Sequence, residues 1–190
     1  MHKGYNPVHV TLRGARGLPS FRCQRVNGLL STILTRQRKR RYADEFQVVE
    51  FSIQDNHLHL IVEATGANAP QALRAGVTGL MVAFAKRLNN MLRRKGKVWG
   101  DRWHGQELPS PREVRNRLVY VFRNVVHHGV RVIGSGFVDW YSSAWRFAGW
   151  KRPVVTYNEM GTWPAAPPRT WLLERGWKRH GLLDTRETSR

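Results

Sequence analysis

The sequence predicts an α+β domain built on a four-stranded antiparallel sheet. Short stretches that alternate between apolar and polar residues are separated by longer stretches with apolar residues at helical spacing. They follow one another over residues 8–128 in the order strand, helix, strand, strand, helix, strand, helix. The chain has 190 residues, of which 41% are hydrophobic and 11% aromatic. One compact core can therefore form, and global disorder is excluded.

The first strand and the first helix are marked by the spacing of their apolar residues. Residues 8–13 alternate, which is typical of a half-buried strand, and Gly14 and Gly17 end it. Ser20 can cap the helix that follows. Five apolar residues of this helix fall at helical spacing: Val26, Leu29, Leu30, Ile33 and Leu34.

Two more strands are expected to form a hairpin, because residues 46–53 and 57–63 both alternate and only three residues separate them. The first of these strands is expected to carry on one face Val49, Phe51 and Ile53. The second is expected to carry Leu58, Leu60 and Val62 on one face, and on the other His57, His59 and Ile61.

The longest helix begins near Pro70 and ends before Gly96, with a basic last turn. A short segment over residues 99–108 can add the fourth strand. Ser110 and Glu113 then form a capping box that opens the last helix, which runs to about residue 128. The first six elements have the order of the ferredoxin-like arrangement, an antiparallel sheet with helices on one face.

The composition changes beyond residue 136. Six of the eight tryptophans lie in the last part of the chain, and prolines cluster over residues 164–168. We interpret residues 1–136 as one domain and residues 137–190 as a Trp- and Pro-rich C-terminal extension packed on it. One short helix is expected in the extension near residues 170–175.

The net charge of +19 predicts a polyanionic partner, because such an excess of positive charge repels itself unless a partner neutralises it. No apolar run is long enough to span a membrane, and the start of the chain lacks the apolar stretch of a secretory signal. The single cysteine, Cys23, excludes a disulfide framework. We therefore expect a cytoplasmic protein that binds nucleic acid and no membrane.

Two dense basic runs are the main candidates for nucleic-acid contact, and we favour phosphate binding over simple solvation of a helix end. The first run contains Arg36, Arg38, Lys39, Arg40 and Arg41. The second contains Arg93, Arg94, Lys95 and Lys97. Two aromatic residues beside the second run are candidate platforms for base stacking, Trp99 and Trp103.

Two pairs of residues are candidates for a catalytic or metal-binding site. His57 and His59 are two apart on a strand, so both imidazoles leave the same face and form half of a divalent-metal site. Taken alone, the pair favours two surface imidazoles over a metal site. On the last helix, Tyr120 and Asn124 lie one turn apart and off the apolar stripe. A core-packing role therefore fits Tyr120 poorly.

Six segments of the chain, taken together, resemble the single-tyrosine HUH transposases, and in particular the REP-associated tyrosine transposase branch. The matching segments are residues 9–13, 56–62, 96–103, 120–124, 128–130 and 140–143. The resemblance implies the ferredoxin-like fold of the HUH endonuclease type. It also implies DNA strand cleavage and rejoining on single-stranded or hairpin DNA, by a monomer or a homodimer.

The resemblance assigns roles to four residues. Tyr120 would be the catalytic nucleophile that forms a covalent 5′-phosphotyrosine. His57, His59 and Asn124 would hold a divalent metal ion, Mg²⁺ or Mn²⁺. The acceptor of the phenol proton is left open.

Other interpretations stay open at this point. The chain could be a non-catalytic DNA-binding regulator on the same fold, or a basic RNA-binding protein, because sheets with exposed aromatic residues also bind RNA. Three residues are secondary candidates for the site. His9 could approach it from the first strand, His127 lies on the helical flank of Tyr120, and Glu63 could orient a ligand or pair with an arginine.

Overall fold

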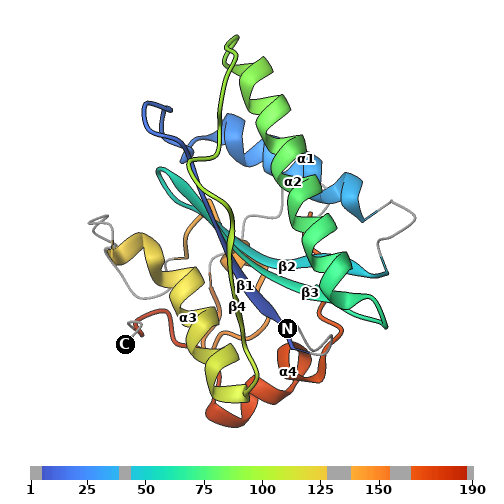
Figure 1. Ribbon diagram of the computed structural model, residues 1–190. Helices are drawn as coiled ribbons and strands as arrows, with labels where there is room; N and C mark the ends of the chain where they lie inside the picture. The colour runs from blue at the N-terminus through green and yellow to red at the C-terminus, as the bar shows by residue number, and fades with distance from the viewer. Residues whose placement is uncertain (1–5, 39–43, 128–137, 155–163, 188–190) are drawn as a thin grey trace.

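The computed structural model describes residues 6–38, 44–127, 138–154 and 164–187. Its centre is a four-stranded sheet in the order β2-β3-β1-β4, in which all neighbouring strands are antiparallel. The strands are β1 (Val8–Arg13), β2 (Phe46–Ile53), β3 (His57–Ala64) and β4 (His104–Glu107). This order confirms the α+β class and the ferredoxin-like arrangement (Figure 1).

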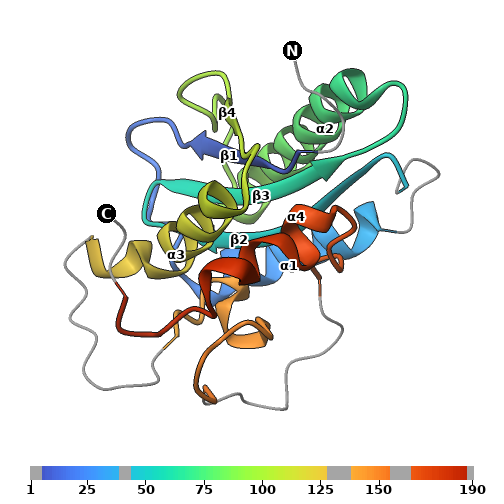
Figure 2. The same cartoon turned by 90° about the horizontal axis from the view of Figure 1, so that it is seen from below.

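Helices α1 (Gln24–Gln37) and α2 (Ala69–Met91) pack on one face of the sheet, and α3 (Pro111–His127) packs on the other (Figures 1 and 2). The main core lies between the sheet and the first two helices. Its sheet residues include Val8, Val10, Leu12, Leu58, Leu60 and Val62. The predicted apolar faces of β1 and β3 are therefore confirmed.

The predicted apolar face of β2 is wrong at one residue. Val48 pairs with Val62 and Glu50 pairs with Ile61, so Val49 has no residue opposite it and forms a β-bulge. Phe51 and Ile53 pack with the core on the side of α1 and α2, whereas Val49 packs on the side of α3. A bulge shifts the alternation by one residue, and apolar spacing within the strand does not reveal it.

The ends of the helices differ in detail from the expectation. Ser20 does not cap α1, because its hydroxyl accepts from the backbone of Arg22 and donates to Asp55 on the β2–β3 hairpin. The capping pair of α3 is present: Ser110 accepts from the backbone N–H of Glu113, and its hydroxyl donates to the Glu113 carboxylate. Helix α2 ends at Met91, so the basic residues after it lie in a loop.

The C-terminal extension covers α3 and the outer edge of β2. It contains the short helices η1 (Ser143–Arg146), α4 (Trp171–Glu174) and η2 (Gly176–His180). Three of its tryptophans pack into the second core beneath α3: Trp145, Trp150 and Trp177. Backbone groups of β2 form hydrogen bonds with the extension: Ile53 donates to Tyr141, and Val48 accepts from Ala166. An exposed edge strand is thereby protected. No described helix could cross a membrane.

Candidate active site

The polar residues of β1 and β3 gather on the face of the sheet that α3 covers. Residues directly opposite each other on antiparallel strands share a face. Thr11 lies opposite His59, Arg13 opposite His57, and His9 opposite Ile61, which packs in the core under α3. The structure therefore places the two predicted imidazoles side by side on the face below the predicted nucleophile.

The His57 and His59 side chains face each other through the same type of nitrogen. Their Nε2 atoms are 2.9 Å apart and their rings are nearly perpendicular, at 84°. The other ring nitrogen of His57, Nδ1, lies 2.8 Å from the carbonyl oxygen of the Asn56 side chain. Because that oxygen only accepts, Nδ1 of His57 carries a proton, and in the neutral imidazole Nε2 then directs its lone pair toward His59.

Tyr120 stands over this pair of strands from α3. Its ring centroid is 5.1 Å from that of His59 and 5.8 Å from that of His9, with edge-on geometry in both cases. Tyr120 is half-buried, whereas the stripe residues Val114 and Leu118 are fully buried. The helical spacing thus placed Tyr120 correctly off the apolar stripe, and the fold brings it beside one of the imidazoles.

Asn124 lies one turn after Tyr120, toward the end of α3. Figures 1 and 2 show this end of the helix on the side of the β2–β3 hairpin, where His57 begins β3. Asn124 is 2% exposed, and its amide nitrogen has no hydrogen-bond partner among the described residues. A buried amide without a partner costs about 1–3 kcal/mol. An unpartnered buried group calls for an explanation, and the binding of a ligand or a water molecule is one.

The two imidazoles fit a divalent metal ion. Two ligand atoms about 2.1 Å from an ion and at right angles lie about 3.0 Å apart, close to the observed Nε2 separation of 2.9 Å. No group of three or more His, Cys, Asp or Glu in the described part of the chain could hold a metal. A third protein ligand for such an ion would therefore be a group of another type, and the amide oxygen of Asn124 is a group of that kind.

His9 contacts the candidate site directly. Its Nε2 is 3.1 Å from Nδ1 of His59, and the residue is only 5% exposed. Burial, and then the positive charge of Arg117, lower the pKa of His9 to about 3. His9 is therefore neutral at physiological pH. The sequence indicates that His9 could approach the site, and the pairing of β1 with β3 explains how it does so.

Two cations near the site were missed by sequence reasoning. The Arg117 guanidinium lies 5.1 Å from the ring centroid of Tyr120 and donates to Gln106 at 2.6 Å. Its spacing of three residues from Tyr120 on one helix is a signal that could have found it. Arg13 is exposed and lies opposite His57, and only the register of β1 with β3 reveals this.

The second basic run precedes β4, at the end of the sheet where β3 begins (Figure 1). Arg93, Lys95 and Lys97 are exposed in the loop between α2 and β4, and Arg94 is tied to Asn89. Val98 at the end of this loop accepts a backbone hydrogen bond from Ala15, which follows β1, and the neighbouring Gly14 donates to the backbone of Asn56 in the β2–β3 hairpin. The loop and His57 therefore lie at the same end of the sheet.

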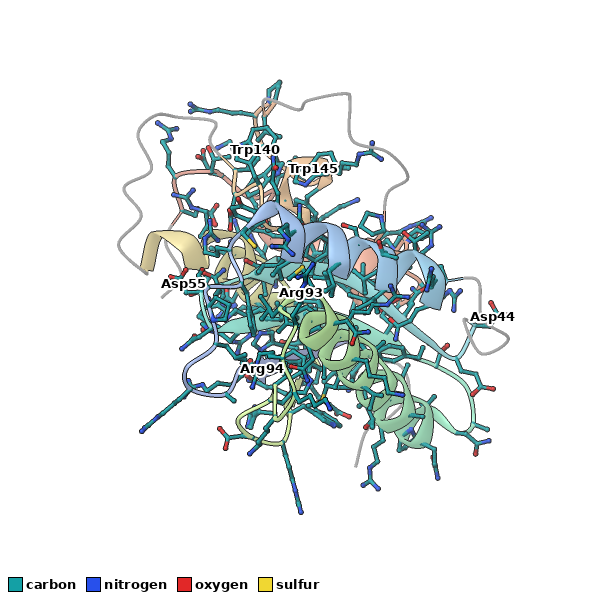
Figure 3. All side chains as sticks on the ribbon, turned by 90° about the horizontal axis from the view of Figure 1, so that it is seen from above. Asp44, Asp55, Arg93, Arg94, Trp140 and Trp145 are labelled. Carbon is teal, nitrogen blue, oxygen red and sulfur yellow. The ribbon has the colours of Figure 1, made fainter. Side chains whose placement is uncertain are left out.

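The first basic run lies elsewhere. Arg36 and Arg38 end α1, on the opposite face of the sheet from His57. Viewed from above, Asp55 of the hairpin and Asp44, which follows this run, lie at opposite ends of the molecule (Figure 3). Arg38 donates to the backbone of Ala165 in the extension. Lys39, Arg40 and Arg41, which the sequence predicted to contact phosphates, lie outside the described residues, as does the side chain of His127.

Trp99 is not a base-stacking platform, contrary to expectation. It is 8% exposed, its ring packs against Phe21 and Phe84, and its indole N–H donates to the carbonyl of Met81. The residue belongs to the core because its backbone bridges to the end of β1. Trp103 is only half-buried and remains a candidate for base stacking.

Glu63 has no role at the site. Its carboxylate accepts hydrogen bonds from the side chain of Gln47, from the backbone of Arg169, and from the backbone and hydroxyl of Thr170. The expectation that Glu63 orients a ligand is wrong, because all of these donors belong to the chain itself. The alternative expectation was that Glu63 pairs with an arginine side chain, but its carboxylate instead binds Thr170 at the start of α4.

The fold is similar to that of nine solved chains, whereas no family model and no curated protein match the sequence. A REP-associated tyrosine transposase bound to a REP hairpin matches with a TM-score of 0.50 and 16% identity, over 68% of this chain and 72% of that chain. A candidate transposase from Deinococcus radiodurans R1 gives a TM-score of 0.44 and 16% identity, over 67% of this chain and 97% of that chain. The first match confirms, for the fold, the resemblance that the sequence predicted.

Proposed function

We propose that this protein cleaves and rejoins single-stranded or hairpin DNA through Tyr120, with a divalent metal ion held by His57, His59 and Asn124. The observation that carries the proposal is the position of the Tyr120 ring, 5.1 Å from the ring of His59, whose Nε2 faces that of His57 at 2.9 Å. A nucleophile beside a cation site is what phosphodiester transfer requires.

The covalent step exchanges one phosphate ester for another. The Tyr120 hydroxyl oxygen bonds to the scissile phosphorus, and the bond from phosphorus to the 3′-oxygen of the upstream strand breaks. The phenol loses its proton and the departing 3′-oxygen gains one, so the products are a 5′-phosphotyrosine and a free 3′-hydroxyl. Attack of a 3′-hydroxyl on the phosphotyrosine reverses these changes and rejoins a strand without an external energy source.

The residues around Tyr120 divide the remaining work. When bound, a divalent ion would polarise the scissile phosphate and offset negative charge on its oxygens. Mg²⁺ prefers oxygen ligands, so Mn²⁺ is the better match to two imidazoles. The Arg117 guanidinium, 5.1 Å from the Tyr120 ring centroid, adds positive charge where the phenol ionises. Exposed Arg13, beside His57, can contact the phosphate backbone.

The basic loop between α2 and β4 is the proposed DNA-binding surface. It presents Arg93, Lys95 and Lys97 at the end of the sheet where His57 lies. A strand bound along this loop would lead its phosphates to the site. The solved neighbour bound to a REP hairpin supports hairpin DNA as the substrate class.

A stem-loop oligonucleotide labelled at either end tests the proposal. A stem-loop with single-stranded flanks is labelled at its 3′ end in one sample and at its 5′ end in another, and is incubated with the full chain and Mn²⁺. We expect the 3′ label to migrate with the protein on a denaturing gel, and the 5′ label to remain on a free fragment.

Tyr120→Phe should abolish the adduct and keep DNA binding, and Tyr141→Phe in the extension is the matched control. An adduct formed by Tyr120→Phe, or an adduct that carries the 5′ label, would contradict the proposal. Salt-sensitive DNA binding without cleavage by the wild-type protein would favour a non-catalytic regulator, and preference for single-stranded RNA would favour an RNA-binding protein.

A further inference from the structure

We infer that His9 is a positioning residue of the candidate metal centre, which accepts a hydrogen bond from Nδ1–H of His59 and so keeps Nε2 of His59 available as a ligand. The inference rests on the proposed function for the role of the metal. It concerns a residue of β1 that would itself bind neither metal nor DNA.

Both ring nitrogens of His59 have partners, on opposite sides of the ring. Nε2 faces Nε2 of His57 at 2.9 Å. Nδ1 faces Nε2 of His9 at 3.1 Å and the hydroxyl of Thr11 at 3.3 Å. His9 therefore lies on the far side of His59 from the Nε2 pair, which excludes it from binding the same ion as that pair.

The protonation of these rings has two arrangements. The proton of His57 is on Nδ1, because the Asn56 carbonyl oxygen accepts it. If His59 carries its proton on Nε2, that N–H donates to His57 and the two imidazoles satisfy each other. If His59 carries its proton on Nδ1, both Nε2 lone pairs point into the same space and can bind one cation. The choice between these tautomers decides whether the pair is a metal site.

His9 and Thr11 place acceptors at Nδ1 of His59 and thereby favour the second arrangement. Ligand histidines generally donate their other N–H to a hydrogen-bond acceptor, most often a carboxylate, a backbone carbonyl or water, which sets both the tautomer and the ring orientation. A ring nitrogen of His9 is the closer of the two acceptors, at 3.1 Å against 3.3 Å for the Thr11 hydroxyl. For this role, His9 carries its own proton on Nδ1.

The fold holds His9 in place more firmly than a surface histidine. The residue lies on a central strand, between Ile61 of β3 and Gln106 of β4. Its ring plane is inclined by only 26° to that of His59, with the centroids 5.1 Å apart, and the Tyr120 ring packs edge-on against it at 5.8 Å. The ring is thus fixed between the candidate ligand and the candidate nucleophile.

Two measurements on the full chain without DNA test the inference. The first is a long-range ¹H–¹⁵N correlation spectrum of the metal-free protein, which reports which ring nitrogen of His59 is protonated. The second is the Kd for Mn²⁺, measured by the electron paramagnetic resonance of the free ion. The variants are His9→Leu, which removes the acceptor, His9→Gln, which restores one, and Thr11→Val. His180→Gln, at an exposed position of η2, is the matched control.

We expect the wild-type protein to carry the His59 proton on Nδ1. We expect His9→Leu to raise the Kd for Mn²⁺ by about 10- to 100-fold, the usual loss for such a partner. His9→Gln should recover most of the affinity, and Thr11→Val should lose less than His9→Leu. Near-ultraviolet circular dichroism separates these effects from unfolding, and the rescue by glutamine distinguishes positioning from a packing role.

Two results would overturn the inference. One is a wild-type His59 protonated on Nε2 in the metal-free protein. The other is a folded His9→Leu variant whose Kd for Mn²⁺ equals that of His180→Gln. Failure of the proposed function has a different signature: the wild-type protein would bind Mn²⁺ and respond to His9→Leu, yet form no adduct with DNA. If the wild-type protein binds no Mn²⁺, the metal centre of the proposed function is overturned, and the spectrum alone decides the role of His9.

Discussion

Glu63 and Thr170 are joined by two hydrogen bonds to one carboxylate oxygen, from the Thr170 backbone N–H at 2.8 Å and from its hydroxyl at 2.6 Å. Glu63 lies on β3, the strand that carries His57 and His59, and Thr170 precedes α4 in the extension. The contact joins residues 107 positions apart in the chain. The strand of the candidate site and the C-terminal extension are thus directly connected.

Glu63→Gln should lower the free energy of unfolding by about 2–4 kcal/mol, because it introduces an amide donor among groups that all donate. Urea unfolding followed by circular dichroism measures the change. Glu174→Gln, at an exposed site on α4, is the control and should change the stability by less than about 0.5 kcal/mol. Equal stabilities of the two variants would show that the Glu63 contacts do not hold the extension.

Glu50 predicts an unusual dependence of stability on pH. Its side chain is buried on β2, one carboxylate oxygen has no partner among the described residues, and burial raises its pKa from 4.5 to about 8. Between these values the unfolded chain ionises this group and the folded protein does not. The contribution of Glu50 to the free energy of unfolding is therefore fully present below pH 4.5 and is lost as the pH rises through 8.

The free energy of unfolding should consequently fall by up to about 1.4 kcal/mol per pH unit over this interval from Glu50 alone. Glu50→Gln should remove that part of the slope, since a neutral amide does not titrate. Urea titrations of both proteins between pH 5 and about pH 8 measure it. Parallel slopes for the wild type and the variant would show that Glu50 ionises normally.

Asn124→Ala should separate metal binding from stability. The substitution removes a buried amide whose nitrogen has no partner among the described residues, so the free energy of unfolding should stay within about 1 kcal/mol of the wild type or rise. The Kd for Mn²⁺ should rise at least about tenfold, because a ligand is lost. A large loss of stability with unchanged Mn²⁺ affinity would instead identify Asn124 as a structural residue.

Trp99→Ala should act on folding rather than on DNA. The ring packs against Phe21 and Phe84, so its loss should cost about 3–5 kcal/mol of unfolding free energy. Trp103→Ala, at a half-buried ring beside Gly105, should cost much less. Thermal unfolding compares the two, and DNA affinity measured well below both melting temperatures should be unchanged in Trp99→Ala.

Lys95→Ala should weaken DNA binding through one phosphate contact. The slope of log K against log salt concentration should become shallower by about 0.7–0.9, the value for one contact. Arg36→Ala removes another exposed cation, at the end of α1 and on the face of the sheet opposite to His57, and should leave the slope unchanged. Fluorescence anisotropy with a labelled stem-loop across a salt series measures both slopes. Equal effects of the two substitutions would show that binding follows net charge and not the basic loop.

Much of the fold could be predicted because the order of strands and helices is encoded in local periodicity. The alternation of Leu58, Leu60 and Val62 identified the buried face of β3, and this alone placed His57 and His59 on the opposite face. The bulge at Val49 and the burial of Trp99 could not be predicted in this way. Both depend on how a neighbouring strand pairs, which local spacing does not contain.

The sequence by itself determined which residues share a face within one strand or one helix, including His57 with His59 and Tyr120 with Asn124, because backbone geometry repeats over a few residues. Only the tertiary structure decided what those faces meet. The register of β1 with β3 brought His9 to His59, the position of α3 brought Tyr120 above them, and the extension supplied the donors around Glu63. These partners lie 50 or more residues apart in the chain, where packing and strand pairing determine contact and periodicity carries no information.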